Sequence, residues 1–196
     1  MVKETKWSIV QAHAEISFNM SHLLTTHTKG NFKLFDANIY TKGKDFTTAE
    51  VNLYIDASSI YTGDEKRDEH LKSCDFLDVK NYKQIIFVSS TIGKYINGKY
   101  ELWGELTMLG ITKNVKLEVL FGGILTDFLG NEKVRFTVTG KINRNDWGLT
   151  WNTPVAVGVL MIGEEVAISC KIELINISEK KSIVKFKSKN NGEAIF

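Results

Sequence analysis

The sequence contains almost no proline and very little cysteine. Its only proline is Pro154 and its only cysteines are Cys74 and Cys170, whereas glycine occurs 15 times. Many glycines and almost no prolines suit a chain rich in β-strands, because glycine ends strands, opens bulges and turns hairpins. A chain of 196 residues can bury a core as one domain without disulfide or metal support. We therefore expect no structural disulfide between the two cysteines.

The chain also lacks a strong net charge and a long apolar run. Its 25 Lys and Arg residues against 23 Asp and Glu residues give a net charge of +2, which does not indicate binding to nucleic acid or to an anionic membrane. No stretch is apolar enough to span a bilayer, and residues 1–7 contain no apolar core of a signal peptide. We expect a cytoplasmic protein, or a periplasmic or secreted one if a signal peptide has been removed.

Apolar and polar residues alternate along most of the chain. Such alternation places the apolar side chains of a strand on one face of a sheet. The pair Asn97-Gly98 is typical of a tight hairpin. Regularly spaced short strands joined by hairpins predict an all-β protein, either an antiparallel barrel or a sandwich. The alternation is clearest in residues 14–20, 51–57, 102–108, 134–142 and 166–174.

The chain divides into a long strand-rich part and a basic tail. We expect one strand-rich domain, a barrel or a sandwich, over residues 1–177 and a Lys-rich, solvated tail over residues 178–196. Within the domain, residues 66–73 are polar and can form a short helix, for which Asp64 is a suitable N-cap.

One long polar segment, Ser58–Leu77, interrupts the alternation. A histidine oriented by a carboxylate is a common general base, so His70 with Asp68 or Asp75 is a candidate for a hydrolase-like site. The other interpretation is a loop in which Arg67 and the carboxylates fix the path of the chain, and charged loop residues usually have this role.

Other catalytic signals are missing. The sequence has no glycine-rich phosphate loop, no G-x-S-x-G elbow and no H-E-x-x-H motif. The four histidines and two cysteines lack the spacing of a zinc site, which needs about three converging ligands. We therefore expect a protein that is not an enzyme and that holds no metal.

Several short motifs occur in an order that is characteristic. They are Trp7, His13, Ile16, Phe18 and His22; Gly30 and Phe32; Ser59, Ile60 and Thr62; Arg67-Asp68-Glu69-His70-Leu71, Ser73 and Asp75-Phe76; Tyr82 and Phe87; Gly104-Glu105-Leu106-Thr107; Gly110-Ile111-Thr112-Lys113; and Arg144, Asp146, Gly148 and Leu149. In this order, from about Trp7 to Ile175, the chain resembles the YceI-like family of bacterial lipocalin-like proteins, also called polyisoprenoid-binding proteins.

The resemblance implies an extended antiparallel β-barrel of about eight strands, lipocalin-like, with one or two short helices. It also implies a long interior cavity that takes an isoprenoid, an isoprenoid quinone or a similar long-chain, fatty-acid-like lipid, and it implies a homodimer. Four features depart from the family pattern, and one of them is that the secretion signal of most relatives is absent here. Leu77 stands where a second Phe is frequent, Lys83 stands where Pro is frequent, and the Lys-rich tail extends past the usual end.

The predicted ligand contacts follow from this resemblance together with the alternation. No cofactor is expected other than a bound lipid, and its polar head should stay near the mouth of the cavity. Leu71 and Phe76 of the polar segment should line or close the cavity. The strand residues expected to contact the lipid are Ile16, Phe18, Val51, Leu53, Ile55, Leu102, Leu106, Met108, Phe136, Val138, Ile168, Cys170 and Ile172.

Three functions therefore compete. The first is a lipid-binding protein for transport, storage or sequestration of an isoprenoid. The second is a hydrolase-like enzyme that uses His70 with Asp68 or Asp75. The third is a filled barrel that acts through its surface. A hollow interior would favour the first function, and a solidly packed interior would favour the third.

Overall fold

A computed structural model describes residues 3–22, 26–93, 98–152, 154–156, 159–160 and 162–178. The predicted tail beyond residue 178 and the Asn97 half of the predicted hairpin signal lie outside the described residues. Both cysteines are free, Cys74 at the surface and Cys170 in the interior. Burial raises the pKa of the Cys170 thiol to about 12.

The described part is built almost entirely from strands. Its strands are β1 (Glu4–Ile9), β2 (Glu15–His22), β3 (Thr26–Phe32), β4 (Phe35–Lys42), β5 (Asp45–Asp56), β6 (Ile60–Tyr61), β7 (Gln84–Ile92), β8 (Lys99–Met108), β9 (Ile111–Thr126), β10 (Glu132–Asn143), β11 (Pro154–Ala156), β12 (Val159–Leu160) and β13 (Ile162–Asn176). Its helical elements are α1 (Glu65–Lys72) and three short 3-10 turns, η1 (Gln11–His13), η2 (Ala57–Ser59) and η3 (Arg144–Trp147).

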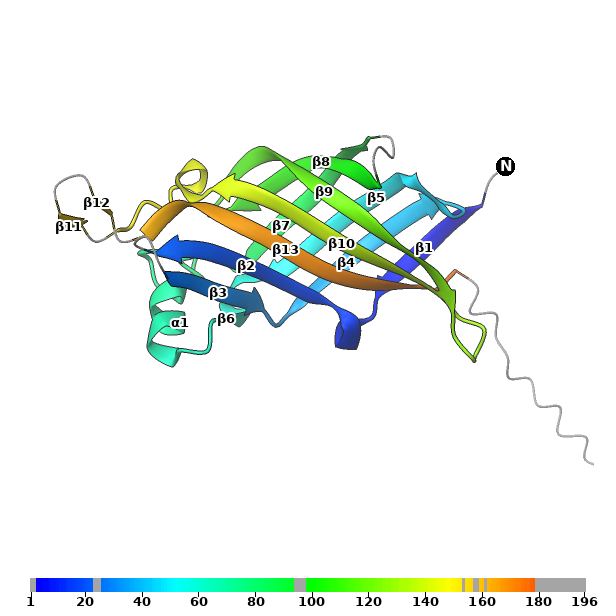
Figure 1. The fold of residues 1–196 in the computed structure, drawn as a ribbon, viewed down its shortest axis with the longest axis horizontal. Helices are drawn as coiled ribbons and strands as arrows, with labels where there is room; N and C mark the ends of the chain where they lie inside the picture. The colour runs from blue at the N-terminus through cyan, green and yellow to red at the C-terminus, as the bar shows by residue number, and fades with distance from the viewer. Residues whose placement is uncertain are drawn as a thin grey trace, which may run out of the picture.

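The strands close into a barrel (Figure 1). Strands β1, β4, β5, β7, β8, β9, β10 and β13 follow one another around the ring, and β13 pairs with β1 to close it. Strands β2, β3 and β6 extend the sheet from the N-terminal part of β13, which pairs with β2. The predicted lipocalin-like antiparallel barrel of about eight strands is confirmed. Closure is favourable because it leaves few unpaired strand edges.

One end of the barrel is packed with aromatic side chains. Trp7 is completely buried, and its Nε1 donates a hydrogen bond of 2.8 Å to Thr41 Oγ1. The ring of Phe46 lies 5.1 Å from Trp7 and 5.0 Å from Phe136, measured between ring centroids. Phe121, at 6.2 Å from Phe46, completes the group. These four rings form an aromatic plug across this end of the barrel.

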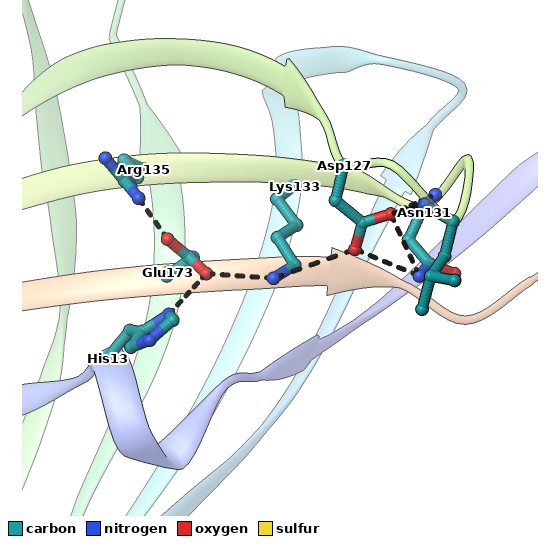
Figure 2. Close-up of polar contacts among 7 residues, drawn as sticks. His13, Asp127, Asn131, Lys133, Arg135 and Glu173 are labelled. Atoms are coloured by element: carbon teal, nitrogen blue, oxygen red, sulfur yellow. Dashed lines mark hydrogen bonds and ion pairs between the residues drawn. The ribbon is translucent and has the colours of Figure 1, made fainter.

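A buried carboxylate lies on the outer side of the barrel wall at the same end (Figure 2). The side chain of Glu173 is only 3% exposed. It accepts hydrogen bonds of 2.7 Å from His13 Nδ1 and from Arg135 Nε, and Lys133 Nζ lies 3.6 Å away. The bond from His13, with a further contribution from Arg135, lowers the pKa of Glu173 to about 2 despite its burial.

Glu173→Gln should lower the free energy of unfolding by about 2 kcal/mol at pH 7, since bonds to a charged group stabilise more than bonds to an amide. The lowered pKa makes this contribution complete above the ordinary glutamate pKa of 4.5 and removes it as the pH falls toward about 2. Urea denaturation at pH 7 and pH 3 measures the difference. Glu101→Gln is the control, because Glu101 pairs with Lys116 while half exposed. Equal losses in the two variants would contradict the role given to Glu173.

Candidate functional site

An apolar cavity of about 280 Å³ lies inside the barrel. All eight strands of the ring contribute to its wall, as do β2, β3 and α1. Among the described residues that line it, only Ser17, Tyr100 and Arg144 carry a nitrogen or oxygen atom in the side chain. The cavity wall can therefore solvate an apolar molecule and offers very few polar partners.

The cavity is elongated along the strands. On β13, alternate residues from Val166 to Leu174 line it, which corresponds to roughly 26 Å of strand at about 3.3 Å per residue. It reaches the aromatic plug at Phe46 and Phe136, and it extends at the other end to Leu71 and Phe76 beside α1. A long and narrow molecule fits such a space better than a compact one.

All side chains that the sequence suggested as ligand contacts line this cavity. Their contact with a ligand remains a prediction, whereas their position on the inner wall is a feature of the fold. They lie on β2 (Ile16, Phe18), β5 (Val51, Leu53, Ile55), α1 (Leu71), the turn after α1 (Phe76), β8 (Leu102, Leu106, Met108), β10 (Phe136, Val138) and β13 (Ile168, Cys170, Ile172).

Several wall residues were missed by the sequence reasoning. Ile85 and Phe87 of β7 line the cavity, but they lie in the continuous apolar run Ile85–Val88, where no alternation is visible. Val115, Leu117 and Val119 of β9 do alternate with polar residues, so this signal was present in the sequence. Leu77, at the position where the family often has Phe, is also buried against the cavity.

The polar segment forms a capped helix that is bonded to Thr62, the residue directly after β6. Asp64 Oδ1 accepts a bond of 3.1 Å from the backbone N–H of Arg67, which confirms the predicted N-cap. Asp68 is buried and accepts bonds from the backbone N–H and the hydroxyl of Thr62. Arg67 donates to the hydroxyl and the carbonyl of the same Thr62. These bonds hold α1 in place, so that Leu71 faces the cavity.

The histidine of this segment is not part of the cavity wall. His70 Nε2 lies 3.0 Å from Asp75 Oδ2, and its ring makes edge contacts with Phe76 and Trp151 at 5.1 and 4.6 Å. Asp68 bonds Thr62 rather than His70. A pair of His70 with Asp68 is therefore not assembled, and the pair of His70 with Asp75 lies outside the cavity lining.

Arg144 is the single charged side chain among the described residues of the wall. It is 3% exposed, and burial lowers the pKa of its guanidinium, an effect opposed by nearby Glu164. Nε donates to the Gly163 carbonyl at 3.0 Å, and Nη1 donates to the carbonyls of Trp151, at 2.9 Å, and Leu149. The guanidinium thus bonds three backbone carbonyls.

Comparison with known proteins agrees with this architecture. The sequence model of the family described as YceI-like domain matches residues 7–174 of this chain. A UPF0312 protein of Staphylococcus aureus (strain MSSA476) is 32% identical over 176 residues, which cover 89% of this chain and 99% of that protein. The chain belongs to the YceI-like family. A UPF0312 protein of Staphylococcus epidermidis is also similar to this YceI-like chain, with 32% identity over 170 residues, 86% of this chain and 96% of that protein.

Solved structures share the YceI-like barrel. The YceI protein of Campylobacter jejuni superposes with a TM-score of 0.68 and 28% identity, over 78% of this chain and 87% of that one. BcnA of Burkholderia cenocepacia gives a TM-score of 0.71 at 23% identity, over 84% and 98%. A domain of Saccharophagus degradans described as polyisoprenoid-binding gives 0.60 at 14% identity, over 87% and 98%. The last two likenesses concern the fold alone.

Proposed function

We propose that this YceI-like protein is a non-catalytic binding protein that holds a long-chain isoprenoid, an isoprenoid quinone or a similar lipid inside its barrel. The observation that carries the proposal is the elongated cavity with an almost wholly apolar wall. The description of the Saccharophagus degradans domain as polyisoprenoid-binding points to the same ligand class. Transport, storage or sequestration of the lipid is the role that such binding would serve.

The physical basis of the binding is simple. Each buried CH₂ group contributes about 0.8 kcal/mol, so a long chain gains ample affinity without specific polar contacts. A filled barrel would have no space for such a chain, and the cavity therefore favours the lipid-binding alternative over a surface-acting barrel. The position of His70 outside the cavity lining supports binding rather than hydrolysis.

The polar head of the ligand belongs near Arg144 in this proposal. Among the described residues, the guanidinium bonds carbonyls through Nε and Nη1, and Nη2 is therefore the nitrogen proposed to donate to an oxygen of the ligand. A carbonyl, hydroxyl or acidic head group would match this donor. The apolar chain would then extend along β10 and β13 toward the aromatic plug.

Organic extraction of the purified protein, followed by mass spectrometry, tests the proposal. We expect an isoprenoid or another long-chain lipid in an amount close to that of the protein. An extract without lipid, combined with a failure of the protein to retain added geranylgeraniol, would contradict it. The homodimer implied by the family resemblance belongs to the same proposal, and a solution mass of two chains is its test.

A further inference from the structure

The cavity ends at the aromatic plug, where Phe46 and Phe136 form its end wall. Their ring centroids lie 5.0 Å apart, and the rings meet edge to face. Trp7 and Phe121, the other two rings of the plug, pack against Phe46 but are not among the described residues that line the cavity. Trp7 has no exposed surface, so the space behind Phe46 is filled. The ring of Phe46 is therefore the surface that the far end of a bound chain meets.

A bulge in β5 fixes the direction of Phe46. The pairing of β4 with β5 shifts register, so that residues 46–49 lie opposite Thr41 alone. Such a bulge bends a strand and re-aims its side chains. The Thr48 hydroxyl donates a hydrogen bond of 2.6 Å to the Asp45 carbonyl within the bulge. The backbone around Phe46 is thus held in one shape, and its ring crosses the end of the barrel toward β9 and β10.

Strand β10 connects the two ends of the cavity. Phe136 lies on it at the plug, and the strand ends at Asn143, directly before Arg144. Figure 1 shows β10 running along the length of the barrel. From Phe136 to Asn143 the strand spans roughly 23 Å, at about 3.3 Å per residue. The Phe136 ring and the Arg144 guanidinium occupy part of this length, so it is an upper limit for a chain that reaches from one to the other.

Glycines on the inner face keep the interior open between these ends. A Cβ atom on Gly104 would lie 2.5 Å from Phe87 Cζ, and one on Gly30 would lie 2.4 Å from Phe18 Cζ. Both distances are far shorter than a carbon–carbon contact, so only glycine fits there. The rings of Phe87 and Phe18 consequently lie flat over the glycines of the wall, and both line the cavity. One continuous space joins the two ends.

We infer that Phe46 and Arg144 set the length of the prenyl chain that the barrel accepts, at about four isoprene units. The inference rests on the proposed function, in which the head group lies near Arg144 and the chain extends toward the plug. An isoprene unit adds four carbon–carbon bonds of about 1.5 Å, or about 5 Å along a staggered chain. Four units need about 20 Å and fit before the Phe46 ring, whereas five need about 25 Å and exceed the span of β10. A longer chain loses either the bond of its head group or the burial of its last unit.

Competition between prenols of different length tests this inference. Radiolabelled geranylgeraniol, with four isoprene units, is displaced from the purified protein by unlabelled geranylgeraniol or by geranylfarnesol, with five. The unmodified chain should bind geranylgeraniol at least about tenfold more tightly, since the fifth unit costs a bond or leaves apolar surface in water. Phe46→Ala opens the end wall, so geranylfarnesol should bind to this variant at least as tightly as geranylgeraniol. A merely structural role of Phe46 would weaken the binding of both prenols alike and leave their ratio unchanged.

Phe121→Ala is the matched control, because it removes the same ring from the same plug at a position that does not line the cavity. It should keep the preference for geranylgeraniol. Ala49→Phe is the reverse variant, because it adds a ring to the cavity wall within the bulge of β5. It should shift the preference to farnesol, with three units, and it tests the inference even where Phe46→Ala does not fold. Thermal melts followed by circular dichroism show which variants are folded.

Three results would overturn the length limit: equal binding of the two longer prenols by the unmodified chain, an unchanged ratio in folded Phe46→Ala or Ala49→Phe, or the same change of ratio in Phe121→Ala. If geranylgeraniol is still retained in these cases, the proposed function stands and only the role of Phe46 is wrong. An unmodified chain that retains no prenol would contradict the proposed function itself, and the length limit with it.

Discussion

Trp7→Ala should lower the free energy of unfolding by about 3–5 kcal/mol, the usual cost of deleting a large buried aromatic side chain. Trp7 is completely buried in the aromatic plug, against Phe46, and its indole N–H bonds Thr41. The variant leaves a void and also leaves the Thr41 hydroxyl without this donor. Equilibrium denaturation by urea, followed by circular dichroism, measures the change.

Trp103→Ala provides the comparison for Trp7. Trp103 is 42% exposed on β8, and the Lys116 ammonium lies over its ring, 5.4 Å from the ring centroid. Its removal should cost no more than about 1 kcal/mol. Similar losses for the two tryptophans would show that the plug contributes no special stability and that this end of the barrel is loosely packed.

Val138→Trp should weaken the binding of geranylgeraniol about a hundredfold. Val138 lies on the inner face of β10, opposite Val119 on β9 and Cys170 on β13, and all three line the cavity. An indole ring at this place would displace about three or four methylene groups of a bound chain, and at about 0.8 kcal/mol each this corresponds to about a hundredfold in affinity. Titration calorimetry or retention of the radiolabelled prenol measures the effect.

Thr139→Trp tests the same substitution one residue further along β10. Successive residues of a strand point to opposite faces, and Thr139 is exposed on the outer face. This variant should bind geranylgeraniol like the unmodified protein. Circular dichroism spectra of both variants would show whether the barrel is intact. Unchanged binding by a folded Val138→Trp variant would place the ligand elsewhere and contradict the proposed function.

The inner wall was predictable where a strand alternates cleanly. Ile16 and Phe18 on β2, or Ile168, Cys170 and Ile172 on β13, follow from a period of two alone once the apolar face is taken as the inner one. The period of two could not be used on β7, because Ile86 and Val88 are as apolar as the inward Ile85 and Phe87. In that strand, only the pairing with β5 and β8 decides which side chains face inward.

The polar segment shows a different limit. Its composition fits both an acid–base site and a structural loop, because His, Asp and Arg serve in both. The choice depends on which partners meet in space. Asp68 and Arg67 both bond Thr62, and His70 lies beside Asp75 outside the cavity lining. These contacts favour the structural interpretation of the segment.

The sequence by itself determined the fold class, the family and most of the inner wall, because side-chain alternation and short ordered motifs are local properties of the chain. Only the tertiary structure decided the contacts between distant segments. Glu173 is bonded by His13 and Arg135, and Arg144 by carbonyls of β13 and of the loop after η3, because the pairing of β13 with its neighbouring strands brings these groups together.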